Sequence, residues 1–164
     1  CIRDRYVDKT GLIEYTNSVL NTTNAYICNS RPRRFGKSYA ANMLAAYYSK
    51  GADSEKMFSE LEIGKNEDFK KHLNKYDVIH IDIQWFLANC DDVDNVVKHI
   101  AEAVLDELRV AYPGILPPEI FSLPDALSRI KDKTGQKFIV IVDEWDVLIR
   151  DEAANKKAQE DYFL

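Results

Sequence analysis

Hydrophobic residues recur along the chain at two different spacings, and each spacing predicts a different kind of element. In several segments they return every three to four residues, which places them on one face of a helix. This spacing predicts helices over residues 10–20, 37–49, 54–61, 66–73, 92–111 and 123–131. The most regular apolar stripe lies in 92–111 and is formed by Val93, Val96, Val97, Ile100, Val104, Leu105 and Leu108.

Shorter, uninterrupted apolar runs predict strands between these helices. They cover residues 24–28, 77–83 and 138–142. The last run, Phe138-Ile-Val-Ile-Val142, is rich in β-branched residues, a composition typical of a strand that is covered on both faces of a sheet. Because helices and strands alternate, the sequence predicts an α/β fold with a mostly parallel sheet flanked by helices.

Composition narrows the class of protein. Of the 164 residues, 46% are hydrophobic and 30% are charged, and the net charge of −5 gives no general attraction to nucleic acids or anionic lipids. The apolar runs are too short to cross a membrane, so we expect a soluble, cytoplasmic protein. Cys1, Cys28 and Cys90 are widely spaced, so we expect reduced thiols and no zinc site, with Cys28 buried in the first predicted strand.

The loop between the first predicted strand and the next helix carries candidate chemistry. It has the sequence Ser30-Arg-Pro-Arg-Arg-Phe-Gly-Lys-Ser38 and ends in the second half of a P-loop, or Walker A motif, G-x-x-x-x-G-K-[ST]. Gly36 permits the turn, Lys37 reaches the β- and γ-phosphates, and the Ser38 hydroxyl binds Mg²⁺. Arg31 replaces the first glycine of the motif. The predicted nucleotide-binding residues are Arg34, Phe35, Gly36, Lys37, Ser38 and Tyr39.

A second motif follows the last predicted strand. Four or more apolar residues ending in two acids, here Asp143 and Glu144, form a Walker B pattern. Asp143 would bind Mg²⁺ together with Ser38, and Glu144 would orient the water that attacks the γ-phosphate. With both motifs in the expected order, the sequence predicts a P-loop NTPase domain that binds ATP and Mg²⁺. Glu144 and Lys37 are the predicted catalytic residues.

Other conspicuous residues have two interpretations each. Arginines 31, 33 and 34 either contact phosphate or are solvated, and Phe35 is expected to pack beneath the loop. Asp82 either assists a metal or water or caps the segment that follows. The aromatic residues Trp85, Phe86 and Trp145 are expected to pack. The Asp8-Lys9-Thr10 tripeptide is expected to begin the first helix as a capping cluster.

Four segments together resemble the bacterial AAA-ATPase-like family, and the resemblance covers essentially the whole chain. They are Tyr6-Val-Asp-Lys-Thr10, Ser30–Ser38, Val78-Ile-His-Ile-Asp82 and Val142-Asp-Glu-Trp-Asp146. The resemblance implies an ATP-binding core that uses Lys37, Ser38, Asp143 and Glu144, and it makes the missing first glycine a family trait. It also implies that residues 8–10 border the base of the nucleotide. Members often carry a PD-(D/E)XK nuclease-like domain after the ATPase, so the partner expected first is the C-terminal remainder of the same protein.

The resemblance also bears on the extent of the domain. In this class of ATPase a sensor strand follows Walker B and inserts between the P-loop strand and the Walker B strand. We therefore expect residues 1–164 to be one P-loop domain, truncated at its C-terminal end. Apolar surface near Tyr26–Cys28 and Ile139–Val142 would then be open to a partner or to a second copy in a homo-oligomer.

The expected activity is hydrolysis of ATP to ADP and phosphate in the intact protein. The main alternative is a regulatory switch that binds ATP with little turnover. Two further alternatives are a small-molecule kinase and a structural scaffold that has lost its nucleotide. A kinase fits poorly, because the loop lacks its first glycine and no arginine-rich lid is recognisable.

Overall fold

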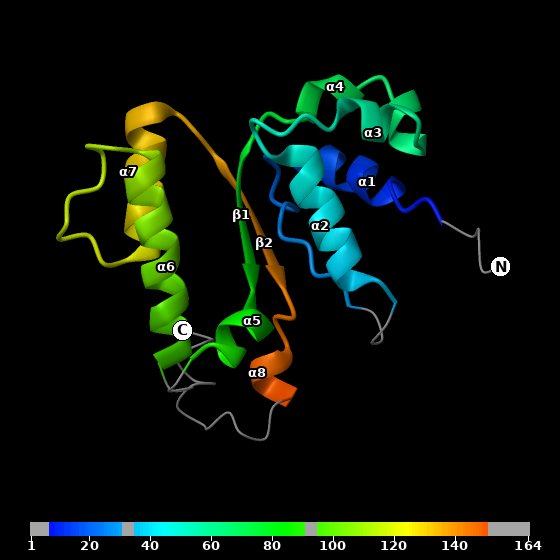
Figure 1. Ribbon diagram of the computed structural model, residues 1–164. Helices are drawn as coiled ribbons and strands as arrows, with labels where there is room; N and C mark the ends of the chain where they lie inside the picture. The colour runs from blue at the N-terminus through cyan, green and yellow to red at the C-terminus, as the bar shows by residue number, and fades with distance from the viewer. Residues whose placement is uncertain (1–6, 31–34, 91–94, 151–164) are drawn as a thin grey trace. The chain divides into compact units, whose positions relative to one another are not determined.

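The computed structural model describes residues 7–30, 35–90 and 95–150, which belong to two compact units, Cys1–Tyr76 and Asp77–Leu164 (Figure 1). The elements of the first unit are α1 (Gly11–Val19), α2 (Lys37–Tyr48), α3 (Glu55–Ser59), the 3₁₀ helix η1 (Glu62–Lys65) and α4 (Phe69–His72). Those of the second are β1 (Asp77–Asp82), α5 (Ile83–Ala88), α6 (Val96–Ala111), α7 (Leu123–Thr134), β2 (Phe138–Asp143) and α8 (Val147–Arg150).

The first unit is built around the C-terminal half of α2. Tyr47 and Tyr48 are almost completely buried there, and the Tyr47 ring meets that of Phe58 edge-on with centroids 5.3 Å apart. Their hydroxyl groups are paired as well: Tyr47 donates to the carbonyl of Phe69 at 2.7 Å, and Tyr48 lies 2.6 Å from the Thr16 hydroxyl. Because buried hydroxyls need such partners, these bonds fix α1 and α4 against α2.

The end of α2 is held by one side chain. Asn74 has a left-handed backbone, with φ of 53°, and its amide donates to the carbonyl groups of Ala46, Tyr47 and Ser49. These are carbonyls that the last turn of a helix leaves without an intrahelical donor. Asn74 thus fixes the C-terminal end of α2, the helix that begins at Lys37.

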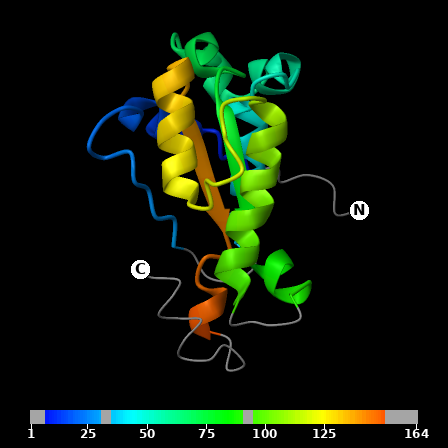
Figure 2. The ribbon, with the colours of Figure 1, turned by 90° about the vertical axis from the view of Figure 1, so that its left-hand side faces the viewer.

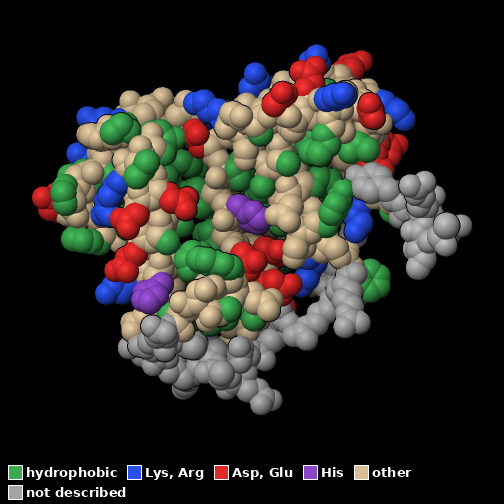
Figure 3. Space-filling model, in the orientation of Figure 1, with side chains coloured by type: hydrophobic (Ala, Val, Ile, Leu, Met, Phe, Trp, Pro, Cys, Tyr) green, Lys and Arg blue, Asp and Glu red, His purple; other side chains and the backbone are tan. Residues whose placement is uncertain are grey.

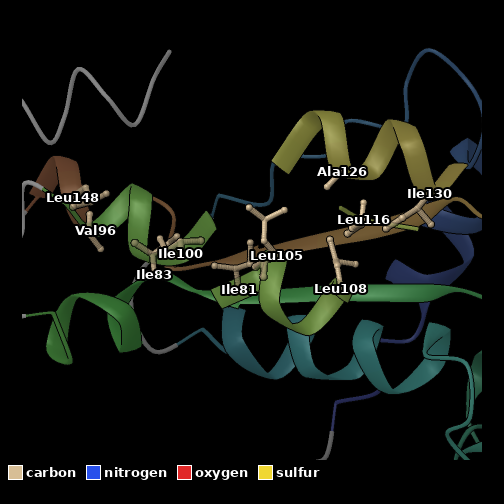
Figure 4. Packing of buried hydrophobic residues seen from close by; sticks show 11 residues of the cluster. Ile81, Ile83, Val96, Ile100, Leu105, Leu108, Leu116, Ala126, Ile130 and Leu148 are labelled. Atoms are coloured by element: carbon tan, nitrogen blue, oxygen red, sulfur yellow. The ribbon is translucent and has the colours of Figure 1, made fainter. Parts of the chain in front are cut away.

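The second unit has a parallel pair of strands with helices on one face. β1 and β2 pair in register from Asp77 opposite Phe138 to Asp82 opposite Asp143. The helices α6 and α7 lie against one face of this pair (Figures 1 and 2). The side chains between them form a buried cluster, seen in Figure 4, that contains Ile81, Ile100, Leu105, Leu108, Ala126, Ile130 and Leu148.

Most of the predicted elements are present, with small changes of boundary. The helices predicted over 10–20, 37–49 and 123–131 correspond to α1, α2 and α7, and the last two predicted strands correspond to β1 and β2. The long helix predicted over 92–111 is α6, whose described part begins at Val96. The short helix α5 was not predicted, because Ile83, its first residue, continues the apolar and polar alternation of β1.

Two predictions about strands are wrong. Residues 24–28 are not a strand: Tyr26 is 96% exposed and Cys28 is exposed too, and no strand among the described residues pairs with this segment. Its backbone therefore lacks the ladder of hydrogen bonds that defines a strand. β2 is not covered on both faces either, since Val140 is 50% exposed. Hydrophobic side chains also reach the surface in Figure 3. The expectation of open apolar surface near Tyr26 and Val140 is confirmed, while what covers it stays a prediction.

Candidate functional site

The predicted P-loop residues begin helix α2. Gly36 is the N-cap and has a left-handed backbone, with φ of 76°, and its carbonyl accepts the first helical bond from the Ala40 N–H at 3.1 Å. The N–H groups of the first turn have no acceptor within a helix, and they carry the positive end of the helix dipole. The first turn of α2 thus offers N–H groups that could face an anion. The phosphate-binding role of Gly36 to Tyr39 stays a prediction.

The side chains of this segment differ in burial. Lys37 is half-buried, and no carboxylate among the described residues lies within ion-pair distance of its ammonium group. Ser38 is exposed, as a metal-binding hydroxyl must be before a ligand arrives. Arg34, the arginine among the predicted nucleotide-binding residues, lies outside the described residues, as do Arg31 and Arg33.

One prediction about packing around the loop is wrong. Phe35 does not pack beneath the loop but is 61% exposed. Tyr39, in the first turn of α2, is exposed as well, and the buried residues of that helix begin at Ala40. Phe35 and Tyr39 thus remain accessible, which leaves their predicted role in nucleotide binding as a proposal.

The sequence did not predict that Lys9 lies beside the loop that precedes α2. Its ammonium donates to the Phe35 carbonyl at 3.0 Å, although the two residues are 26 positions apart in the chain. The same nitrogen lies so close to Gly36 that a Cβ there would meet it at 2.7 Å. The sequence offered one signal, a single lysine between two residues of capping type, and it does not reveal the distant contact.

Asp8 and Thr10, the neighbours of Lys9, form hydrogen bonds with η1. The Asp8 carboxylate accepts from the Thr10 N–H at 2.8 Å and from the Glu62 N–H at 2.8 Å, and the buried Thr10 hydroxyl accepts from the Ile63 N–H at 3.1 Å. Desolvation raises the pKa of Asp8, but these hydrogen bonds outweigh it and hold the pKa below its ordinary value. Thr10 is the N-cap of α1, as the capping prediction places the tripeptide, but no side-chain cap hydrogen bond forms there. Asp8 and Thr10 instead bind each other and η1.

The Walker B residues end β2 in the second unit. Asp143 is only 8% exposed, and one carboxylate oxygen accepts from the Glu144 N–H at 2.9 Å. In the register of the sheet it stands opposite Asp82, at the carboxyl ends of both strands, where ligands bind in parallel α/β sheets. Asp82 itself accepts from the Trp85 N–H at 3.0 Å, so the structure supports its capping interpretation.

Glu144 has an unusual backbone for its residue type. Its φ is 51°, in the left-handed region, and its carbonyl accepts from the Val147 N–H at 3.0 Å in the turn that leads to α8. A non-glycine residue in this conformation costs about 1 kcal/mol, and such strain is concentrated at functional sites. Asn21 and Asn74 share this conformation, but asparagine adopts it more readily than glutamate does. Glu144 is the position that the Walker B pattern assigns to the catalytic acid, a role that stays a prediction.

The aromatic residues near this turn are only partly packed. Phe86 lies against the buried cluster, as predicted, and its ring meets that of Trp85 edge-on with centroids 5.0 Å apart. Trp85 is 58% exposed, and Trp145 is exposed as well, so the packing prediction is wrong for these two. Trp85 lies on α5 outside the cluster, because that short helix buries Ile83 instead.

The donor set bears on which metal the site could hold. Among residues 7–30, 35–90 and 95–150, no group of three or more His, Cys, Asp or Glu side chains is arranged to hold a metal ion. A dedicated metal cage therefore does not fit the described residues. Mg²⁺ needs less from the protein, because it is usually bound by one or two carboxylates together with substrate phosphates and water. The hydroxyl of Ser38 and the carboxylate of Asp143 are each of the donor type that Mg²⁺ accepts, and their joint use stays a prediction.

Residues 3–163 match a family described as predicted AAA-ATPases. The chain belongs to the AAA-ATPase-like family. The match spans both units and includes every predicted site residue, so a nucleotide-binding, ATPase-like role is the role of the family as a whole. No curated protein and no solved structure matches the chain. In the part of this AAA-ATPase-like chain that the structure describes, no helix is both long and apolar enough to span a bilayer.

Proposed function

We propose that the protein binds ATP together with Mg²⁺ and hydrolyses it to ADP and phosphate. The observation that carries this proposal is the start of α2, where a left-handed Gly36 precedes a half-buried Lys37 that has no carboxylate partner among the described residues. A cation without a counter-ion beside the N–H groups of a first helical turn attracts an anion. Membership of the AAA-ATPase-like family supports ATP as that anion.

Lys37 has two tasks in this proposal. In the ground state its ammonium binds the β- and γ-phosphates, and the N–H groups of the first turn of α2 bind the same oxygens. As the bond to the γ-phosphorus breaks, negative charge grows on the β–γ bridging oxygen. A fixed cation stabilises that charge more than it stabilises the bound substrate, which is what accelerates the reaction.

Ser38 and Asp143 would hold the metal ion. The Ser38 hydroxyl is exposed, and the Asp143 carboxylate is nearly buried with one oxygen already fixed by the Glu144 N–H. Mg²⁺ bound there would neutralise phosphate charge during transfer. The hydrogen bond to Asp143 limits the orientations of the carboxylate, so less freedom is lost when it binds a ligand.

Glu144 would orient the attacking water. Its carboxylate accepts a hydrogen bond from the water and directs the oxygen toward the γ-phosphorus, in line with the bond that breaks. The left-handed turn at Glu144 ends β2 sharply and so sets the direction of this side chain relative to Asp143. The alternative function, a switch with little turnover, needs the same residues except Glu144.

The experiment that tests the proposal compares ATP binding and phosphate release by the intact protein and three variants. Lys37→Ala should lose ATP binding, whereas Glu144→Gln should bind ATP and release phosphate at least about a hundredfold more slowly. Lys56→Ala is the control, because Lys56 is an exposed lysine of α3 in the same unit as Lys37. Unchanged ATP binding in Lys37→Ala would overturn the assignment. Tight binding by the wild type with no turnover would favour the switch.

A further inference from the structure

The Asp8-Lys9-Thr10 tripeptide points its side chains toward two different elements. Asp8 and Thr10 bind backbone N–H groups of Glu62 and Ile63 at the start of η1. Lys9, between them, reaches the Phe35 carbonyl at 3.0 Å. Thr10 is completely buried, so the segment on both sides of Lys9 is anchored and the lysine is held beside the loop that precedes α2.

The Lys9 ammonium has few other partners. The Phe35 carbonyl is its one hydrogen-bond acceptor within the described ranges, and no carboxylate there lies within ion-pair distance. The contact is exposed to solvent, and among the described residues no opposite charge neutralises the ammonium. It therefore adds a second positive group, besides Lys37, next to the first turn of α2.

The contact with Phe35 has a consequence for the next N–H group. The carbonyl of Phe35 and the N–H of Gly36 belong to one peptide unit, and in a trans peptide these two groups point in opposite directions. The chain has no cis peptide bond among its described residues. When Lys9 holds the carbonyl on one side, the Gly36 N–H must point to the other side, and no acceptor in the described part of the chain contacts it there.

The conformation of Gly36 makes this orientation useful. A left-handed residue at the N-cap lets consecutive N–H groups point toward a common centre, which is the arrangement that binds anions. Without the ammonium, the Phe35–Gly36 peptide could rotate about its flanking bonds, because glycine restricts them little. The contact that holds this peptide in place is the one from Lys9.

We infer that Lys9 is a positioning residue of the nucleotide site, which holds the Phe35 carbonyl so that the Gly36 N–H faces the bound phosphate. This inference rests on the proposed function, because it needs a phosphate at the start of α2. Lys9, which the sequence analysis places in a helix cap, thus orients the Phe35–Gly36 peptide. The ligand class is a polyphosphate, since the Gly36 N–H would meet a phosphate that ATP and ADP share.

The peptide in question can be observed selectively. Phe35-Gly36 is the one Phe-Gly pair in the sequence, which has 6 glycines and 7 phenylalanines. Labelling phenylalanine with ¹³C at the carbonyl and glycine with ¹⁵N therefore gives a single correlation peak from residues 1–164 in an HNCO spectrum. Its carbon frequency reports on the hydrogen bond to Lys9, and its proton and nitrogen frequencies report on the Gly36 N–H.

The experiment compares wild type, Lys9→Met, Lys9→Arg and Lys56→Met, with pyrophosphate, ADP and ATP as probes. In Lys9→Met the Phe35 carbon signal of the free protein should move upfield, and the shift of the Gly36 N–H on adding pyrophosphate should be lost or much reduced. Affinities for ADP and ATP should fall together, by roughly tenfold or more. Lys9→Arg should recover part of both effects, because guanidinium also donates to a carbonyl. Lys56→Met, which removes an equal charge from an exposed position, should behave as wild type.

Three outcomes would overturn the inference. One is a Lys9→Met peak identical to that of wild type, both free and with pyrophosphate. Another is a loss of affinity for ATP alone with ADP unchanged, since that would indicate a direct contact with the γ-phosphate. The third is a melting temperature of Lys9→Met as low as that of Asp8→Asn, which removes an anchor on η1. That result would mean that the lysine only holds the fold together.

The inference and the proposed function fail in different ways. If wild-type protein binds neither ATP nor pyrophosphate, the proposed function fails, and the Phe35 carbon signal still reports whether Lys9 holds the carbonyl. If wild type binds ATP and Lys37→Ala does not, the proposed function stands. An unchanged response of the Gly36 N–H in Lys9→Met then refutes the positioning role alone.

Discussion

Asp82 and Asp143 stand opposite each other at the ends of two parallel strands, yet their carboxylates have different surroundings. Asp82 is exposed and accepts from the Trp85 N–H at 3.0 Å, which caps α5. Asp143 is 8% exposed and accepts from the adjacent Glu144 N–H at 2.9 Å. The two aspartates are partners in the sheet register, but Asp82 caps helix α5, whereas Asp143 binds the turn that follows β2.

The first prediction separates these two carboxylates. Asp82→Ala should lower the free energy of unfolding by about 1 kcal/mol, because it removes a helix cap, and should leave phosphate release per folded molecule unchanged. Asp143→Asn should remove Mg²⁺-dependent phosphate release while keeping the shape of the side chain. Urea unfolding followed by circular dichroism and a phosphate-release assay measure the two effects. Equal loss of activity in both variants would contradict the division of roles.

The second prediction concerns Gly36 and uses Gly51 as a matched control. Both glycines have left-handed backbones, with φ of 76° and 85°, so an alanine at either position costs about 1 kcal/mol in backbone strain. A Cβ at Gly51 has open space, whereas one at Gly36 would meet the Lys9 ammonium at 2.7 Å. Gly36→Ala should therefore also displace Lys9 from the Phe35 carbonyl and weaken ATP binding by roughly tenfold or more.

Isothermal titration with ATP and thermal melting distinguish the two glycine variants. Gly51→Ala should melt earlier than wild type and bind ATP with unchanged affinity. If Gly36→Ala bound ATP as tightly as wild type, the left-handed turn before α2 would not be part of the nucleotide site.

Local patterns in the sequence were sufficient for most elements, including the start of α2 and the strand before the predicted Walker B acids. The start of α2 at Lys37 follows from Gly36, which permits a turn, and from the helical spacing of the apolar residues after it. The strand Phe138–Asp143 follows from a run of β-branched residues. In each case the signal lies within a few residues of the feature it predicts, because the interactions that decide it are local.

The misses have the opposite origin. Residues 24–28 carry the apolar run of a strand, but a strand also needs a neighbour, and none of the described residues supplies one. The bond from Lys9 to Phe35 joins residues 26 positions apart, so no window of sequence contains it. Exposure of Tyr39 depends on which face of α2 is buried, and most of the buried residues of that helix lie beyond its first turn.

The third prediction is a pH dependence of stability that arises from His72. This side chain is nearly buried, stacks on Tyr76 and lies 2.7 Å from its hydroxyl, measured from Nδ1. Burial, with the nearby Lys71 charge, lowers the pKa of His72 below the ordinary value of 6.5. Between the folded and unfolded pKa values the unfolded chain binds more protons, so this contribution to stability is complete above 6.5 and is lost as the pH falls.

The measurement is the free energy of unfolding from about pH 7.5 to about pH 5.5 in wild type, His72→Gln and His80→Gln. The decline toward low pH should be shallower in His72→Gln, because the group that takes up the proton on unfolding has been removed. His80 is exposed, so His80→Gln should keep the slope of wild type. A slope that His72→Gln leaves unchanged would assign the dependence to other groups.

The fourth prediction uses the strained backbone of Glu144. Glycine adopts a φ of 51° without the steric cost that a side chain brings, so Glu144→Gly should relieve the turn while it removes the carboxylate. We expect its stability to equal that of wild type or to exceed it by up to about 1 kcal/mol, although phosphate release is lost. Glu119 is an exposed loop residue whose φ is not positive, so Glu119→Gly should lose stability, by about 0.5 kcal/mol or more, and keep its activity. Chemical unfolding and a phosphate-release assay on both variants test whether Glu144 lowers stability while it supports activity. A clear loss of stability in Glu144→Gly would refute this idea.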